Sequence, residues 1–149
     1  MNIGEIFYCS RCLKQLDQEG VCIYCGYDPS SYVDADALEE GTLLCGKRFQ
    51  VGAVNRRMRF GFLYGAYDFL KQKPVFIFEF FPSLKLDRDP RTGTIVIVSP
   101  ENEARFNNEL CCLKTALGHY CCISEENHTL YLFDGDLKTD GEYMENRGE

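Results

Sequence analysis

The sequence predicts an α+β protein in which a small cysteine-rich module precedes an antiparallel sheet of about five strands with one packed helix. Two Cys-x-x-Cys pairs lie close together near the N-terminus. Short segments of strand character, separated by turn residues, fill the middle of the chain. One longer segment carries apolar residues at spacings of three and four, which is the period of a helix lying on a sheet.

The overall composition fits a globular protein. Its 149 residues are enough for one ordinary domain, or for a small module joined to a medium one. The formal net charge of −7 disfavours nucleic acid and an anionic membrane surface as partners. The N-terminus lacks the pattern of a signal peptide, and no window approaches the roughly 20 apolar residues of a membrane span. We therefore expect a cytoplasmic protein.

The first element, residues 1–28, is predicted to be a zinc ribbon. It contains two hooks with cysteines three positions apart, Cys9 with Cys12 and Cys22 with Cys25. Without an export signal, cysteines at such spacing more often hold metal than form disulfides. Two hooks supply the four thiolates that tetrahedral zinc prefers and leave no position for water, so one structural Zn²⁺ ion is predicted. Iron in the same cage and a disulfide-bonded form are the alternatives.

The other cysteines invite a second metal site together with one histidine. This set consists of Cys111, Cys112, His119, Cys121 and Cys122. Adjacent cysteines project in different directions on a helix and to opposite faces on a strand, so we favour core or boundary positions for them. Cys45 is predicted to be a small buried or linker residue.

The second element, residues 29–41, is polar and acidic and is predicted to be a linker. Segments of strand character then follow at residues 48–54, 60–67, 75–81 and 94–99. Most of their connections are too short for parallel crossovers, which favours an antiparallel meander. The sheet domain is expected to span residues 42–135.

A helix is predicted to follow the strand segment at residues 94–99 directly. Ser99 can cap it, Pro100 fits its first turn, and Gly118 can end it. Its apolar stripe is formed by Phe106, Leu110, Leu113 and Leu117. Two last strands are predicted at residues 120–124 and 129–133, and residues 136–149 are predicted to be a polar tail.

Several short motifs occur in a fixed order along most of the chain. They are Cys25-Gly26-Tyr27-Asp28-Pro29, Gly41-Thr42-Leu43-Leu44, Arg48-Phe49-Gln50-Val51-Gly52, Phe60-Gly61, residues 64–68 and 75–83, Arg88-Asp89-Pro90-Arg91-Thr92-Gly93, and Glu103-Ala104-Arg105-Phe106 with Glu109. In order and spacing they resemble the small, N-terminal lobe of bacterial serine/threonine protein kinases, in the group where a zinc ribbon precedes the kinase. The resemblance implies the fold of a kinase small lobe, whereas function has to be argued from the site.

The resemblance also implies that the chemistry is lost. The phosphate-binding pattern GxGxxG falls on residues 56–61, of which only Gly61 is glycine. The strand that normally reads Val-Ala-Ile-Lys carries Phe76 in place of the small residue that roofs the adenine, and Phe78 in place of the lysine. Glu109 occupies the position of the helix glutamate that would pair with that lysine. The catalytic strings of the large lobe do not occur, so we expect a pseudokinase-like protein that is not an enzyme.

The leading hypothesis is therefore a non-catalytic zinc-binding interaction or regulatory module. Phe76, Phe78, Phe80 and Phe81 place apolar material on both faces of one strand, which is typical either of a partner site or of the sheet core. The expected partner is a protein: a kinase large lobe, another kinase or a second copy.

Two alternatives stay open. A nucleotide or anion sensor would use Arg56, Arg57 and Arg59, although a solvated hairpin tip is also typical of this pattern. A zinc-ribbon docking finger would bind protein or nucleic acid. Protein is favoured for it, because Arg11 and Lys14 are the only cations within residues 1–28.

Overall fold

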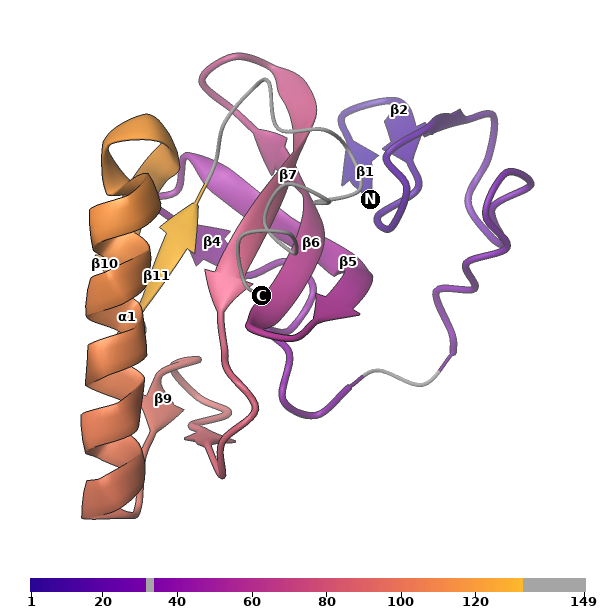
Figure 1. Cartoon of the computed structure of the whole chain (residues 1–149). Helices are drawn as coiled ribbons and strands as arrows, with labels where there is room; N and C mark the ends of the chain where they lie inside the picture. Colours follow the sequence, from indigo (N-terminus) through magenta and orange to yellow (C-terminus); the bar gives the residue numbers. More distant parts are fainter. Residues whose placement is uncertain (32–33, 133–149) are drawn as a thin grey trace.

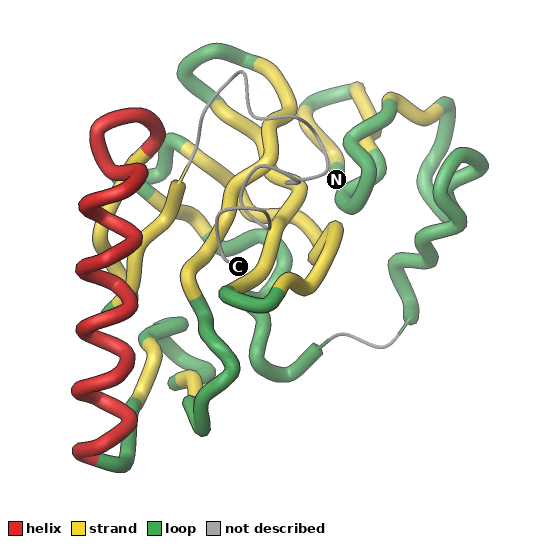
Figure 2. Tube along the Cα trace, viewed as in Figure 1, coloured by secondary structure: helices red, strands yellow, loops and turns green. Residues whose placement is uncertain are grey.

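The protein folds into three antiparallel sheets and one helix within the residues that its structure, a computed structural model, describes. These are residues 1–31 and 34–132, without the side chains of 117–123. The predicted polar tail, residues 136–149, lies outside them. Figures 1 and 2 show the main sheet between the long helix and the cysteine-rich module, which lie on opposite sides of the molecule.

The cysteine-rich module is a small three-stranded sheet with long turns. Its strands are β1 (Asn2–Ile3), β2 (Ile6–Tyr8) and β3 (Gln15–Leu16), in the order β1-β2-β3. The N-terminal ammonium group of Met1 donates a hydrogen bond of 2.7 Å to the carbonyl oxygen of Tyr8, which ties β1 to β2. Strands this short bury little apolar surface, so the module needs other means to hold its shape.

The main sheet has six strands, in the order β10-β11-β7-β6-β5-β4. They are β4 (Leu43–Leu44), β5 (Phe49–Met58), β6 (Gly61–Asp68), β7 (Lys73–Phe80), β10 (Cys122–Glu126) and β11 (Thr129–Leu132). The prediction of about five strands omitted β4. A tight turn returns β4 onto β5, and its residues Cys45 and Lys47 have φ angles of 54° and 71°. Left-handed conformations at non-glycine residues are rare, so sequence patterns do not forecast such a turn.

The segment predicted as a strand over residues 94–99 does not join the main sheet. Only β9 (Ile95–Val96) forms there, and it pairs with β8 (Asp87–Arg88) in a separate two-stranded sheet. The amide of Ile95 donates to the carbonyl oxygen of Asn127, in the turn between β10 and β11. This bond holds β8 and β9 against the sheet as an arm.

The single helix of the described residues, α1 (Pro100–Cys121), begins where the sequence predicts and ends later. The amide of Asn102 donates to the hydroxyl of Ser99 at 3.4 Å, so Ser99 is the cap. The helix continues through Gly118, because one glycine costs a helix only about 1 kcal/mol. Phe106 is fully buried and lies 5.2 Å from the ring of Phe80. Leu110 and Leu113 are half-buried beside it.

Both faces of the central strands are covered. One face carries Tyr64 and Glu79 and packs against Leu38, which comes from the segment predicted as a linker. The opposite face carries Phe78 and Phe80, and it faces α1. Phe78, Phe80 and Phe81 are each 2 % exposed, and Phe76 is half-buried against the core. These four rings therefore form the sheet core and do not form an exposed docking patch.

Candidate metal centre

Two knuckles of the same geometry hold the four predicted ligand cysteines. In the first knuckle, the amides of Arg11 and Cys12 both donate to the sulfur of Cys9 at 3.4 Å. In the second, the amides of Tyr24 and Cys25 donate to the sulfur of Cys22 at 3.3 and 3.4 Å. Such amide donors stabilise a sulfur that carries negative charge, as a metal-bound thiolate does.

The two knuckles bring their sulfur atoms to one point. The sulfur of Cys9 lies 3.6 Å from that of Cys25, and the sulfur of Cys12 lies 3.7 Å from that of Cys22. All four ligand atoms lie within 4.8 Å of one another. Sulfurs placed tetrahedrally at 2.3 Å from one zinc ion are about 3.8 Å apart. The four cysteines therefore fit a tetrahedral metal ion, as the spacing of the two hooks predicts.

The protonation of the thiols also suits a metal site. Burial raises the pKa of Cys22, but the amides of Cys25 and Tyr24 outweigh it and bring that pKa down to about 6. Burial raises the pKa of Cys12 to about 12. A metal ion that binds to these thiols displaces the protons that they still carry.

Each knuckle ends in a residue with a left-handed backbone conformation. In the sequence, only the second hook indicates this conformation, through its glycine. Gly26 has a φ angle of 78°, and its amide donates to the carbonyl oxygen of Cys22. Leu13 takes the same place in the first knuckle, with a φ angle of 68° and a bond to the carbonyl oxygen of Cys9. Leucine rarely adopts this conformation, so nothing in the sequence pattern indicates it.

The first knuckle is seated directly on the main sheet. The carbonyl oxygen of Ser10 accepts a 2.9 Å hydrogen bond from the amide of Ala53 in β5. A Cβ atom at Gly65 would lie 2.3 Å from this oxygen, and one at Gly52 would lie 2.8 Å from it. Only glycine therefore admits the knuckle at these two places. Isolated glycines within strand patterns are the available sequence signal, because they often mark close approach of another backbone.

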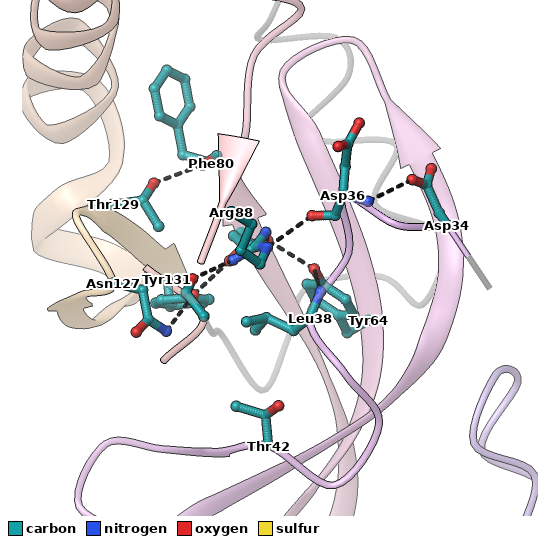
Figure 3. A network of polar contacts seen from close by, with 12 residues as sticks. Asp34, Asp36, Leu38, Thr42, Tyr64, Phe80, Arg88, Asn127, Thr129 and Tyr131 are labelled. Carbon is teal, nitrogen blue, oxygen red and sulfur yellow. Dashed lines mark hydrogen bonds and ion pairs between the residues drawn. The ribbon is translucent and has the colours of Figure 1, made fainter. Parts of the chain in front are cut away.

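A second polar cluster, missed from the sequence, lies inside the fold around Glu79. Its carboxylate accepts hydrogen bonds from the hydroxyls of Tyr64 and Tyr131, and both side-chain NH₂ groups of Arg88 contact it. Arg88 also donates to the carbonyl oxygen of Asp36 (Figure 3) and to that of Gly93. Burial and the neighbouring carboxylate raise the pKa of Tyr64 and of Tyr131. The carboxylate of Glu79 and the guanidinium group of Arg88 both find their hydrogen-bond partners inside the fold. The cluster therefore acts as a structural junction between these segments of the chain.

The three arginines of the predicted sensor do not converge on one point. Arg56 and Arg57 are neighbours on β5, so their side chains leave opposite faces of the sheet. Arg57 donates to Asp34 at 2.9 Å and stacks on the ring of Phe62. Arg59 lies at the hairpin turn, where its guanidinium group packs over the ring of Phe60. It also lines a cavity of about 170 Å³ together with Arg105 and Glu109.

Residue 78, the position that the sequence resemblance assigns to the kinase lysine, lies in the core. Phe78 is buried in the middle of the sheet, between Leu63 of β6 and Leu132 of β11. One carboxylate oxygen of Glu109 is buried and makes no hydrogen bond. The structure thus leaves no charged group at position 78 for this glutamate to pair with.

The remaining cysteines form no further cluster within the described side chains. Cys111 and Cys112 are exposed on α1, which corrects the expectation that they are core or boundary residues. The reason is that α1 touches the sheet through a narrow stripe around Phe106. The side chains of His119, Cys121 and Cys122 lie outside the described set, so that part of the prediction stays a prediction.

Comparisons with known proteins give a likeness of fold. No protein family and no curated protein matches the sequence. Among solved structures, the chain is similar to "PpkA-294 apo form", a bacterial Ser/Thr kinase fragment, with a TM-score of 0.56 and 20 % sequence identity. The match covers 65 % of this chain and 37 % of that one. No helix among the described residues is long and apolar enough to cross a membrane.

Proposed function

We propose that this protein is a non-catalytic interaction or regulatory module, in which a zinc ribbon is joined to a degenerate kinase-like small lobe. One observation carries the proposal: the residue at the position of the phosphate-gripping lysine, Phe78, is a core residue that is 2 % exposed. Phosphoryl transfer depends on charge stabilisation and positioning, and a buried phenyl ring supplies neither.

The neighbouring positions support the same proposal. Phe76, at the position of the residue that roofs the adenine, pairs with Gly65 of β6. Gly65 in turn is covered by the knuckle residue Ser10. The sheet face on which a nucleotide would lie is thus occupied by aromatic rings and by the ribbon.

The decisive experiment is a calorimetric titration of the metal-loaded protein with ATP and ADP, with and without magnesium. We expect no saturable heat and no change in melting temperature. The matched control is the triple variant Arg56→Ala, Arg57→Ala, Arg59→Ala. Binding to the wild type that this variant loses would overturn the proposal in favour of an anion sensor. Binding that the variant retains would overturn it in favour of a working nucleotide cleft.

The proposed metal is one structural Zn²⁺ ion held by Cys9, Cys12, Cys22 and Cys25. Four thiolates in tetrahedral array match zinc, and they leave no open position for catalysis. Elemental analysis of protein purified without added chelator is expected to give one zinc per chain. The variant Cys22→Ser is expected to lose it, whereas Cys111→Ser, which alters an exposed cysteine outside the site, is expected to keep it. Iron in place of zinc would contradict the assignment.

A protein partner is the proposed ligand of the module. The second knuckle presents three large apolar side chains to solvent, and they are Val21, Ile23 and Tyr24. Exposed apolar side chains that cluster on a metal-held turn are typical of a contact surface for protein. Residues 1–28 carry two cations against four acidic residues, which disfavours nucleic acid in the same role.

A further inference from the structure

One peptide group connects the proposed metal site to the main sheet. The bond between Ser10 and Arg11 carries the amide of Arg11, which donates to the ligand sulfur of Cys9. The same planar group carries the carbonyl oxygen of Ser10, which accepts from the amide of Ala53 at 2.9 Å. The direction of this carbonyl is therefore fixed by the sulfur on its other side.

The contact is built to fit a backbone. The nearest neighbours of a Cβ atom at Gly65 all belong to the module, and they are the carbonyl oxygen of Ser10 at 2.3 Å, a methyl group of Leu13 at 2.9 Å and the carbonyl carbon of Ser10 at 3.1 Å. At Gly52 the carbonyl oxygen of Ser10 is again the nearest, at 2.8 Å. The two glycines thus form a slot that the knuckle fills.

Three weaker contacts surround this slot. The side-chain amide of Asn55 donates to the carbonyl oxygen of Arg11 at 2.8 Å. The hydroxyl of Ser10 donates to Glu40 at 3.2 Å, and the rings of Tyr8 and Tyr67 lie 5.9 Å apart. Each is a single exposed or partly buried contact of modest strength, so the seating depends on the shape of the knuckle.

The shape of the knuckle depends in turn on the metal. A module whose strands are two or three residues long cannot hold its turns by its own core. Small modules of this kind are folded by their metal and lose their structure when it is removed. Without the metal, the Cys9 sulfur keeps only its amide hydrogen bonds within the knuckle and its contact with the Cys25 sulfur. These contacts are weaker than a metal–thiolate bond, so the peptide group that follows Cys9 can rotate out of the slot.

We propose that metal occupancy of the four-cysteine site works as a latch, which seats the ribbon on β5 and β6 when the metal is bound and releases this sheet face when the metal is lost. The proposal rests on the metal binding assigned above. It makes the covered face around Gly52, Gly65 and Tyr67 accessible only in the metal-free state.

The test measures hydrogen exchange of the Ala53 amide by NMR, with the amides of the β6–β7 ladder as internal reference. In the zinc-loaded wild type we expect Ala53 to be protected. After removal of zinc with a chelator, we expect it to exchange at least about fivefold faster, because one interface hydrogen bond is lost, while the ladder keeps its protection. Readdition of zinc is expected to restore it.

Gly65→Ala is the matched variant. Its added methyl group collides with the ribbon only, whereas Gly61→Ala would place a Cβ 1.9 Å from the carbonyl oxygen of Glu79 and disturb the sheet itself. We expect Gly65→Ala to bind zinc and keep the ladder, yet to show fast exchange at Ala53. Asn55→Ala, which alters an interface side chain outside the sheet core, is the milder second variant and is expected to shift Ala53 in the same direction.

The outcomes separate the two proposals. Protein that never binds zinc would overturn both the metal assignment and the latch. Protein that binds zinc but keeps Ala53 protected after chelation would overturn the latch and leave the metal assignment intact. Fast exchange of Ala53 in the loaded wild type would also overturn the latch, because the ribbon would then not be seated.

Discussion

At the scale of single residues, Asp68 shows how one buried carboxylate is held charged. It accepts two hydrogen bonds from Arg48, at 3.0 and 2.9 Å, and one from the amide of Leu70 at 3.0 Å. Burial raises the pKa of Asp68, but these donors more than offset it, so the pKa lies below its ordinary value. The group therefore contributes stability above the unfolded pKa, and this contribution is lost as the pH falls through the folded pKa.

We expect Asp68→Asn to lower the free energy of unfolding by about 2 kcal/mol at pH 7, because hydrogen bonds to a charged guanidinium are lost. The difference from wild type should shrink as the pH falls below about 4, where the carboxylate begins to protonate in the unfolded chain. Urea unfolding at several pH values measures this. Asp87→Asn, at an exposed position, is the control. A gap that stays constant with pH would contradict the assignment.

The residues of the metal centre could be predicted from the sequence, and their support could not. The spacing of Cys9, Cys12, Cys22 and Cys25 is a local signal, because each hook is a single turn. Leu13 adopts a left-handed conformation that its residue type does not signal, and the place of Ser10 against two strand glycines depends on contacts between parts of the chain that are about 40 residues or more apart. No local pattern carries that information.

At the scale of elements, Arg88 joins three segments that are distant in the sequence. It links Glu79 of β7 to the arm through the carbonyl oxygen of Gly93, and to the segment before β4 through the carbonyl oxygen of Asp36. The segment predicted as a linker is thereby fastened to the sheet, and Leu38 is buried in the core. A polar composition alone does not reveal such fastening.

We expect Arg88→Met to cost about 3–5 kcal/mol, because it leaves the fully buried carboxylate of Glu79 without its cation. Arg91→Met is the control, since that side chain is 88 % exposed, and it should cost about 0.5 kcal/mol or less. Adding Glu79→Gln to Arg88→Met should recover part of the loss. Equal costs for the two arginine variants, measured by urea unfolding, would contradict the junction.

The order of the elements could be predicted better than their limits. The three central strands and the start of α1 follow from alternation, capping and turn residues, which are local. The strand predicted over residues 94–99 forms only as β9, which is shorter and pairs with β8 instead of with a strand of the main sheet. The bond from Ile95 to Asn127 connects this pair to the main sheet. The end of α1 was also misplaced, since one glycine is too weak a stop to outweigh the bonds that follow it.

At the scale of the whole molecule, the fold is a ribbon and a sheet that share one interface. The sheet resembles a kinase fragment in fold, and this likeness covers 37 % of that fragment. The aromatic residues of β7 fill the interior of the sheet domain. In the proposed function, the second knuckle with its exposed side chains Val21, Ile23 and Tyr24 is the surface that contacts a partner.

We expect the metal-loaded protein to form a discrete oligomer or a stable complex with a protein partner, observed by sedimentation velocity. Ile23 is 83 % exposed, so Ile23→Ser should weaken the association without altering the melting temperature. Val98→Ser, at an exposed apolar residue outside the ribbon, is the matched control and should leave the association unchanged. A monodisperse monomer with no recoverable partner would contradict the interaction proposal.

Gly65, beneath the ribbon, has a consequence for the evolution of this fold. The three nearest atoms to a side chain at Gly65 all belong to the ribbon, whereas a Cβ at Gly52 would also lie 2.9 Å from the carbonyl oxygen of Gly65 in the sheet. A relative that has lost its ribbon therefore has no reason to keep a glycine at position 65, but it still has one at position 52. Gly65 should be inherited together with the four cysteines, and its loss should mark lineages in which the ribbon has gone.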